Sequence, residues 1–253
     1  MTPGPVAPFP LESVVHLVSP TGDCAHDLEE LHEAVARAPE RSLFWHVAGR
    51  LRREPWCDEL PPDDFSAWVG GVVQDRETAE RLSYAVQSLR AGPGTLRAAL
   101  LGALDGVASR PRATRDAPEG GEFAMLTCES VTVPTGLEAR DPASLVEALA
   151  VADPGAWFYH LVETPWLGGQ GPLLPDWLRA QGAERLAAWL GELSESGLPL
   201  EAMRRRLLQR RRRSHVRRRV SEAAASPEGE RKQAARAAVE GLVRRLRRPR
   251  KPA

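Results

Sequence analysis

A segment in the first half of the sequence has a similar second copy 114 residues later. Between residues 20 and 48, twelve of 29 positions are identical to their counterparts at 134–162, with no gap. The identical positions include Pro20-Thr21-Gly22, which recurs as Pro134-Thr135-Gly136, and the first and last residues of Phe44-Trp45-His46, which recurs as Phe158-Tyr159-His160. Agreement of this kind is far above chance, and in a chain of 253 residues it predicts two lobes built from one duplicated module.

Each copy predicts a short strand followed by helices. Residues 11–18 and 123–133 are rich in β-branched side chains and partly alternate, which is typical of a strand that ends at the Pro-Thr-Gly turn. Asp27 and Asp141 precede apolar helical stripes and are predicted helix caps. Because a single strand leaves its backbone groups unsatisfied, we expect the two strands to pair across a pseudo-two-fold axis.

The predicted fold class is therefore mainly α with minor β (α+β), with two duplicated helical lobes, one short strand per lobe and a basic helical C-terminal tail. The predicted organisation is a first copy over 11–107, a linker over 108–121, a second copy over 122–219 that runs into an Arg-rich helix, and a basic helix with a disordered end over 226–253. Pro61-Pro62 is predicted to lie in a loop.

The net charge of zero hides a strong asymmetry. Residues 1–202 carry 15 Arg against 30 Asp and Glu, whereas residues 203–253 carry 19 Arg and Lys against 4 Glu. The two parts therefore have balances of −15 and +15, which is typical of an acidic body with a basic tail. The densest part of the tail holds ten arginines: Arg204, Arg205, Arg206, Arg210, Arg211, Arg212, Arg213, Arg217, Arg218 and Arg219.

A helix with so many like charges repels itself and needs an anionic partner. The equal and opposite charges favour the acidic surface of the chain itself, or of another protein, as that partner. Nucleic acid, bound without sequence specificity, ranks second because counterion release would supply affinity. An anionic membrane surface ranks third.

His46 and His160 are the histidines that coincide between the copies. A neutral imidazole can ligate a metal or transfer protons, but each of these follows two aromatic residues on an apolar stretch. That setting favours a half-buried histidine hydrogen-bonded to a backbone carbonyl. Glu163, three residues after His160, could orient its ring, but Gly49 stands at the matching place in the first copy.

The repeated aromatic residues favour two cores, one in each lobe, over a stacking platform for a sugar. Trp68 and Asp64, with His46 and His160, are the candidate ligand-binding residues. No catalytic triad, metal cluster or nucleotide fingerprint appears, so no catalytic residue, metal or cofactor is predicted.

Three cysteines without ligand spacing, a start without an apolar signal region and apolar runs too short for a bilayer favour a cytoplasmic protein. These features predict the cellular compartment and do not indicate a function.

The motifs together resemble a bacterial family of uncharacterised proteins, a domain of unknown function. The resemblance rests on Pro20-Thr21-Gly22, Phe44-Trp45-His46, Asp64-Phe65-Ser66-Ala67-Trp68 and Glu80-Arg81-Leu82, and on their second-copy matches, with a departure at Leu173-Leu174-Pro175-Asp176-Trp177. It covers about 12–107 and 123–208, leaves out the basic tail, and implies no activity or site residue.

The hypothesis that follows is a non-catalytic binding or adaptor protein whose Arg-rich tail mediates electrostatic association. The alternative is a small-molecule enzyme or binder, with a carbohydrate as one candidate ligand, that uses a cleft near His46 and His160.

Overall fold

The computed structural model describes residues 6–52, 63–88, 96–105, 116–169 and 171–225, with side chains as far as Ser214. The chain divides into two units, residues 1–204 and 205–253, and each is described by itself. The predicted loop at Pro61-Pro62, the linker residues 108–115 and the predicted helix over 226–253 lie outside the described residues. Among the residues that are described, no helix has the length and apolar composition that crossing a membrane requires.

The first unit consists of a strand and a group of helices, followed by a second strand and a second group. In chain order the elements are β1 (Phe9–Ala25), α1 (Leu28–Arg37), α2 (Glu40–Ala48), the 3-10 turn η1 (Gly49–Arg52), α3 (Asp64–Gly71), α4 (Arg76–Ser88), α5 (Leu96–Asp105), β2 (Phe123–Ala139), α6 (Pro142–Val151), α7 (Pro154–Phe158), the π-helical turn η4 (Tyr159–Glu163), α8 (Thr164–Leu167), α9 (Leu174–Ala180) and α10 (Glu184–Glu195). Helix α11 (Leu200–Ala225) runs from the first unit into the second. The mainly α, minor β fold class is confirmed.

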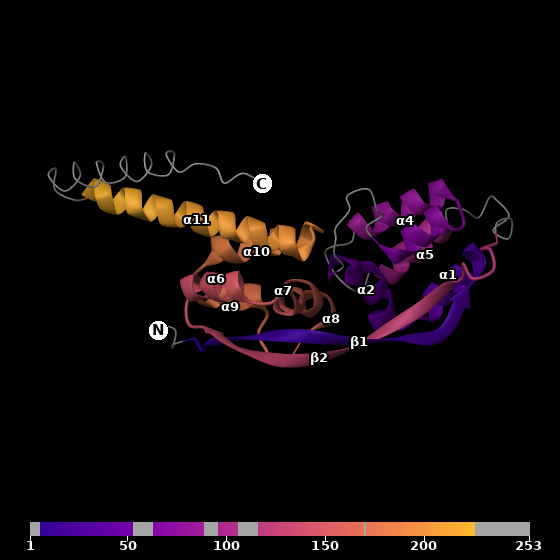
Figure 1. Ribbon diagram of the computed structural model, residues 1–253, viewed down its shortest axis with the longest axis horizontal. Coiled ribbons are helices and arrows are strands. Elements are labelled where there is room, and N and C mark those ends of the chain that lie inside the picture. Colours follow the sequence, from indigo (N-terminus) through magenta and orange to yellow (C-terminus); the bar gives the residue numbers. More distant parts are fainter. Residues whose placement is uncertain (1–5, 53–62, 89–95, 106–115, 170, 226–253) are drawn as a thin grey trace, which may run out of the picture. The chain divides into compact units, whose positions relative to one another are not determined.

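The two strands form an antiparallel two-stranded sheet, as predicted, and helices cover one face of it (Figure 1). Phe9 pairs with Ala139 at one end of the ladder, and Ala25 pairs with Phe123 at the other. The first and last residues of β2 lie 114 positions after those of β1. His16 pairs with Ser130, which is its own counterpart 114 positions later. A local two-fold axis therefore passes between these two residues at the centre of the ladder.

The prediction of short strands that end at a Pro-Thr-Gly turn is wrong. Each strand has 17 residues and continues through that motif, which forms a bulge instead of a turn. Gly22 and Gly136 have φ angles of +92° and +73°, which a side chain would strain. The preceding threonines hold both bulges alike: Thr21 Oγ1 donates to the Met125 carbonyl at 3.1 Å, and Thr135 Oγ1 to the Leu11 carbonyl at 2.5 Å.

The helix caps follow the sequence more closely. Asp27 accepts from two amides of the first turn of α1, and Asp141 forms a capping box with Ser144 at the start of α6. Glu30, three residues after Asp27, accepts from the His26 amide at 2.7 Å.

The start of each strand packs against the helices that follow the other strand. The Phe9 ring lies 5.5 Å from Trp177 of α9, whereas the Phe123 ring lies 5.6 Å from Trp68 of α3. Phe123 and Met125 accordingly belong to the core formed by α1–α5. Neither helix group has a complete core without the strand from the other part of the sequence.

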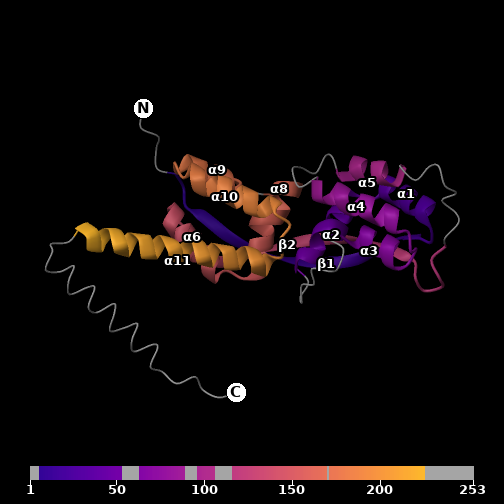
Figure 2. The same ribbon diagram turned by 90° about the horizontal axis from the view of Figure 1, so that it is seen from above.

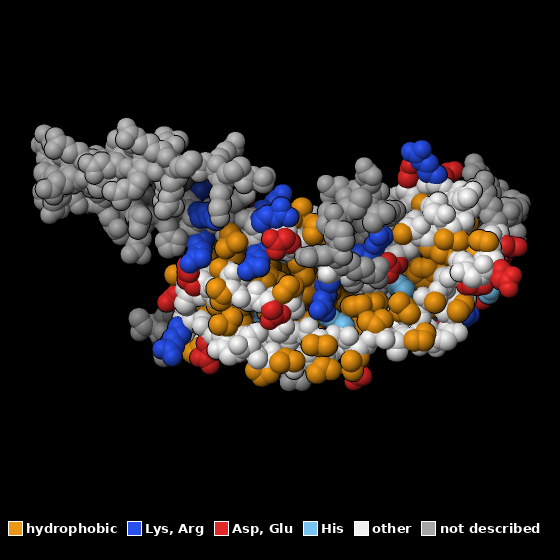
Figure 3. Space-filling view, in the orientation of Figure 1, with side chains coloured by type: hydrophobic (Ala, Val, Ile, Leu, Met, Phe, Trp, Pro, Cys, Tyr) orange, Lys and Arg blue, Asp and Glu red, His pale blue; other side chains and the backbone are white. Residues whose placement is uncertain are grey.

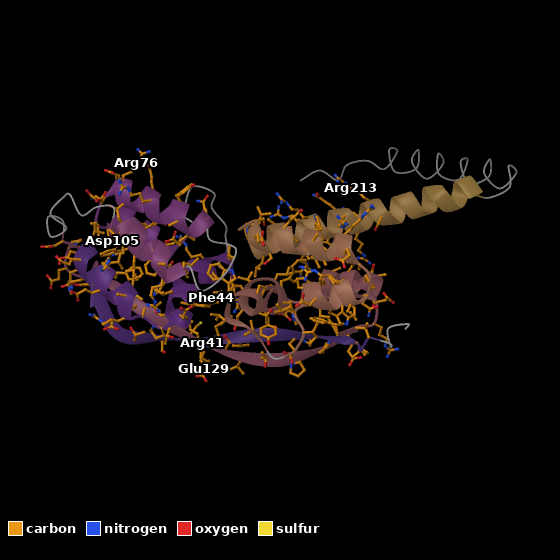
Figure 4. All side chains as sticks on the ribbon, turned by 180° about the vertical axis from the view of Figure 1, so that it is seen from behind. Arg41, Phe44, Arg76, Asp105, Glu129 and Arg213 are labelled. Carbon is orange, nitrogen blue, oxygen red and sulfur yellow. The ribbon has the colours of Figure 1, made fainter. Side chains whose placement is uncertain are left out.

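The two helix groups also meet through a pair of counterpart residues. The rings of Phe44 and Phe158, both about 1% exposed or less, lie 5.9 Å apart. Figure 4 shows Phe44 on α2, between the two groups and above the ribbon. The prediction that each lobe's aromatic residues form a core of their own is therefore wrong for Phe44 and Phe158, which contact each other between the two helix groups.

The other face of the ribbon carries exposed apolar side chains. Val15 and Leu17 of β1 are 52% and 57% exposed, and Val131 and Val133 of β2 are 44% and 43% exposed. Figure 3 shows apolar side chains along this side, and Figure 2 shows the helix groups from above. A one-sided core is what an antiparallel sheet permits.

We expect alanine at either bulge glycine to lower stability. Gly22→Ala and Gly136→Ala place a side chain at positive φ, which costs about 1–2 kcal/mol. Gly102→Ala, inside α5 and with open space around its Cβ, is the control and should raise stability by about 0.5–1 kcal/mol. Urea unfolding measures all three, and equal effects at the bulges and at Gly102 would contradict the bulge geometry.

We expect Phe44→Ala and Phe158→Ala to cost about 3–5 kcal/mol each. Because the rings touch, the double variant should cost less than the sum by about 0.5–1.5 kcal/mol. Denaturant unfolding of the four proteins completes this cycle. Strict additivity would mean that the two rings belong to independent cores.

Candidate functional site

The two histidines that coincide between the copies are buried, and each accepts a hydrogen bond from a strand of the sheet. His46 lies on α2 and His160 on η4, and their residues are 2% and 6% exposed. The Leu126 amide donates to His46 Nε2, and the Glu12 amide donates to His160 Nε2, both at 2.9 Å. Each ring therefore accepts a hydrogen bond from a backbone amide, where the sequence predicted a bond to a carbonyl.

The location of these two amides explains the bonds. Leu126 lies opposite Pro20 and Glu12 opposite Pro134, at the edges of the bulges where the ladder shifts register. A buried amide without an acceptor is costly, so the imidazole replaces the missing strand partner. Since Glu12 and Leu126 are themselves 114 positions apart, both histidines do the same structural work.

The second ring nitrogens differ. His46 Nδ1 lies 3.1 Å from Asp64 Oδ2, and Arg50 Nε lies 3.8 Å from the other carboxylate oxygen of Asp64. In the part of the chain that the structure describes, His160 Nδ1 has no hydrogen-bond partner; the one bond of this ring is at Nε2. Burial lowers the pKa of His160 to about 4, so the ring is neutral near pH 7 and Nδ1 carries the proton.

The other candidate residues are partly brought together. Trp68 and His46 both contact the Phe123 ring, at 5.6 Å and 4.8 Å, and Asp64 contacts His46. Trp68 Nε1 donates to the Gly121 carbonyl at 2.7 Å, and its counterpart Trp177 donates to the Ala7 carbonyl at 2.8 Å. Three candidates therefore cluster at the start of β2, while His160 lies at the start of β1, where its ring contacts Phe9.

Glu163 does not orient His160. Its Oε2 lies 2.7 Å from Nε2 of His16, and the two side chains are 4% and 2% exposed. Arg52 Nη1 donates to Nδ1 of the same imidazole. Burial opposes ionisation of Glu163, but bonds from His16 and Ser130 outweigh it and lower the pKa of Glu163. Burial also lowers the pKa of Arg52.

Sequence reasoning missed His16 because it considered only histidines that coincide between the copies. The available signal was the register: residues 16 and 130 are counterparts, so strands that pair across a two-fold axis can place them opposite each other at the centre. The buried group is one-sided, since Ser130 and Gly49 occupy the positions that match His16 and Glu163.

A cavity adjoins His160. It has a volume of about 60 Å³ and lies beside His160, with Phe9, Tyr159, Thr164 and Leu173 in its wall. Ligand pockets for drug-sized molecules measure roughly 300–1,000 Å³. This cavity can therefore accept only a few non-hydrogen atoms.

The described residues include no group of three or more His, Cys, Asp or Glu that could hold a metal ion. Of the cysteines, Cys24 is exposed and Cys128 is buried, and burial raises the pKa of the Cys128 thiol to about 11. A thiol with so high a pKa is a poor nucleophile. Cys57 lies outside the described residues.

The Arg-rich segment lies on α11. The side chains of Arg205, Arg206, Arg210, Arg212 and Arg213 are exposed, and those of Arg204 and Arg211 are partly buried. The side chains of Arg217, Arg218 and Arg219 lie outside the described ones. Arg204 Nη1 lies 4.0 Å from Glu201 and its Nη2 donates to the Ala150 carbonyl at 3.2 Å, so this arginine also anchors the start of α11 within the first unit.

Comparison with known proteins finds a matching family and a similar solved structure. The pattern of the family described as "Family of unknown function (DUF5752)" matches residues 6–211. The structure of OrfY from Thermoproteus tenax is similar, with a TM-score of 0.67 and 25% sequence identity, over 81% of this chain and 95% of that one. No curated protein matches this sequence.

We expect the stability of the protein to fall between pH 6.5 and pH 4 because of His160. Its pKa is about 4 in the folded chain and about 6.5 when unfolded, so within this window the unfolded state binds the proton more tightly. The contribution is fully present above pH 6.5 and decreases by at most about 1.4 kcal/mol per pH unit below it.

His160→Asn should remove that dependence. At pH 7.5 the variant should be less stable by about 1–3 kcal/mol, because the Glu12 amide loses its acceptor, and the gap should narrow toward pH 4.5. Urea unfolding at three pH values tests this. Parallel curves for the two proteins would show that His160 does not titrate in the window.

Proposed function

Because the chain belongs to the family of unknown function DUF5752, we propose a function from its own geometry: a non-catalytic binding or adaptor protein whose Arg-rich segment associates with acidic surfaces. The observation that carries this proposal is the row of exposed arginines on α11, at Arg205, Arg206, Arg210, Arg212 and Arg213. We further propose that the protein acts in the cytoplasm.

Charge supports an association of this kind. Residues 203–253 hold 19 basic and 4 acidic residues, against 15 and 30 in residues 1–202. On α11, Arg206 and Arg210 are four residues apart, a spacing at which like charges destabilise a helix. An anionic partner would relieve that repulsion, and it would gain affinity by releasing counterions if it were a nucleic acid.

Among partners, the acidic surface of a second copy, or of another protein, comes first in this proposal. Nucleic acid without sequence specificity comes second, and an anionic membrane surface third. The acidic residues needed for the first are present on the same chain, since the net charge of residues 1–202 is −15 and that of residues 203–253 is +15. The arginines between Arg204 and Arg213 have no aromatic residues among them to stack on single-stranded bases.

We also propose that residues 11–219 arose by duplication of one strand-and-helix module, with copies over 11–107 and 122–219 joined by the linker over 108–121. Recurrent contacts support it: the bonds of the two threonines, the two histidines and the two tryptophans each occur at matching places. Such a unit would act as a rigid scaffold that presents the Arg-rich segment.

The alternative, a small-molecule enzyme or binder, has support at one of its two histidines. His46 Nδ1 already has Asp64 of the same chain as its hydrogen-bond partner, so it is not available to a ligand. His160 instead adjoins a cavity of about 60 Å³. The alternative is therefore limited to a small ligand at His160.

We expect association to depend on charge and not on the identity of the basic residue. Arg206, Arg210, Arg212 and Arg213 are changed together to Gln in one variant and to Lys in a matched control, in the full-length chain. The Gln variant should lose salt-sensitive self-association, and its slope of log K against log salt for random duplex DNA should be smaller by up to about 0.9 per lost phosphate contact. The Lys variant should retain both.

The measurements are sedimentation velocity for self-association, fluorescence anisotropy with a random duplex and an RNA, and flotation with anionic liposomes, each at two salt concentrations. Absence of every association at low salt would refute the proposal. Tight, salt-resistant binding to one nucleic-acid sequence would refute its electrostatic basis.

A further inference from the structure

The cavity beside His160 lies where two residues differ in type from their counterparts around His46. Arg50 lies four residues after His46, and Thr164 lies four residues after His160. Asp64 lies four residues before Trp68, and Leu173 lies four residues before Trp177. Arg50 and Asp64 form an ion pair. Their counterparts Thr164 and Leu173 are uncharged, and both line the cavity.

The Nδ1 atoms of His46 and His160 differ in their hydrogen-bond partners. His46 Nδ1 meets the Asp64 carboxylate at 3.1 Å. The His160 residue is 6% exposed, its Nε2 is occupied by the Glu12 amide, and its Nδ1 has no partner among the described residues while the ring forms part of the cavity wall. Because the ring lines the cavity, this nitrogen can donate to an acceptor that enters there.

We propose that this cavity binds a small carboxylate, of the size of formate or acetate, whose oxygen accepts the Nδ1 hydrogen of His160 in the way that Asp64 accepts that of His46. The volume of about 60 Å³ suits a ligand of three or four non-hydrogen atoms. Phe9, Pro10 and Pro172 in the wall would contact its apolar part. The site is independent of the Arg-rich segment, so either proposal can fail alone.

The charge around the cavity limits the affinity. Glu12 also lines it, and no Lys or Arg is among its lining residues. Because so small a ligand makes few contacts, we expect a Kd on the order of millimolar. Glu12→Gln removes a like charge while keeping the backbone amide that binds His160, and should tighten carboxylate binding about five-fold.

The experiment is a titration of the full-length protein, labelled with ¹⁵N in its histidines, with sodium formate and sodium acetate at constant ionic strength. The His160 imidazole signal should shift and saturate, while the His46 signal, already bonded to Asp64, should not respond and is the internal control. Acetamide, a neutral molecule of the same shape, should bind more weakly than acetate.

Leu173→Asp supplies the missing carboxylate from the chain itself and should abolish the response to acetate. Leu173→Asn, which offers an amide oxygen without charge, should do the same and serves if the first variant fails to fold. A His160 signal that does not respond, a response that persists in a folded Leu173 variant, or acetamide that binds as tightly as acetate would each overturn the proposal.

Discussion

The structure of the first unit depends on the antiparallel pairing of β1 with β2 around a local two-fold axis. Because the axis passes between His16 and Ser130, the start of each strand is carried to the helices that belong to the other. Phe9 is thereby buried beside Trp177, and Phe123 beside Trp68. The ladder therefore completes two cores at once, and an isolated strand-and-helix segment would lack one wall of its core.

That pairing creates a problem which the histidines solve. The Pro-Thr-Gly bulges interrupt the ladder at two matching places, and the amides of Glu12 and Leu126 face buried imidazoles there. A glycine at positive φ allows the bulge, a threonine ties it to the opposite strand, and a histidine accepts the free amide. Backbone hydrogen bonding explains why the same residue types recur at both bulges, and no ligand is needed to explain it.

Much of this could be read from the sequence, because the shift of 114 residues identifies counterpart residues and an antiparallel pairing of counterparts implies a two-fold axis. The α+β class, the strand pairing and the caps at Asp27 and Asp141 follow from local patterns. The length of the strands does not, because Pro20 and Gly22 favour a turn locally and are held in a bulge only by the opposite strand. The contact of Phe44 with Phe158 is likewise a property of the assembled pair of helix groups.

The candidate site could be predicted less well, since residues that match between counterparts are those that the fold requires. The informative positions are those where counterparts differ. At the centre, His16 and Glu163 form a buried pair, whereas a side chain at Gly49 would place its Cβ 3.1 Å from the Trp45 ring. Toward the ends of the ladder, Arg50 and Asp64 form an ion pair beside His46, whereas Thr164 and Leu173 line the cavity beside His160. A ligand-binding property in the first unit should therefore be sought at positions where counterpart residues differ.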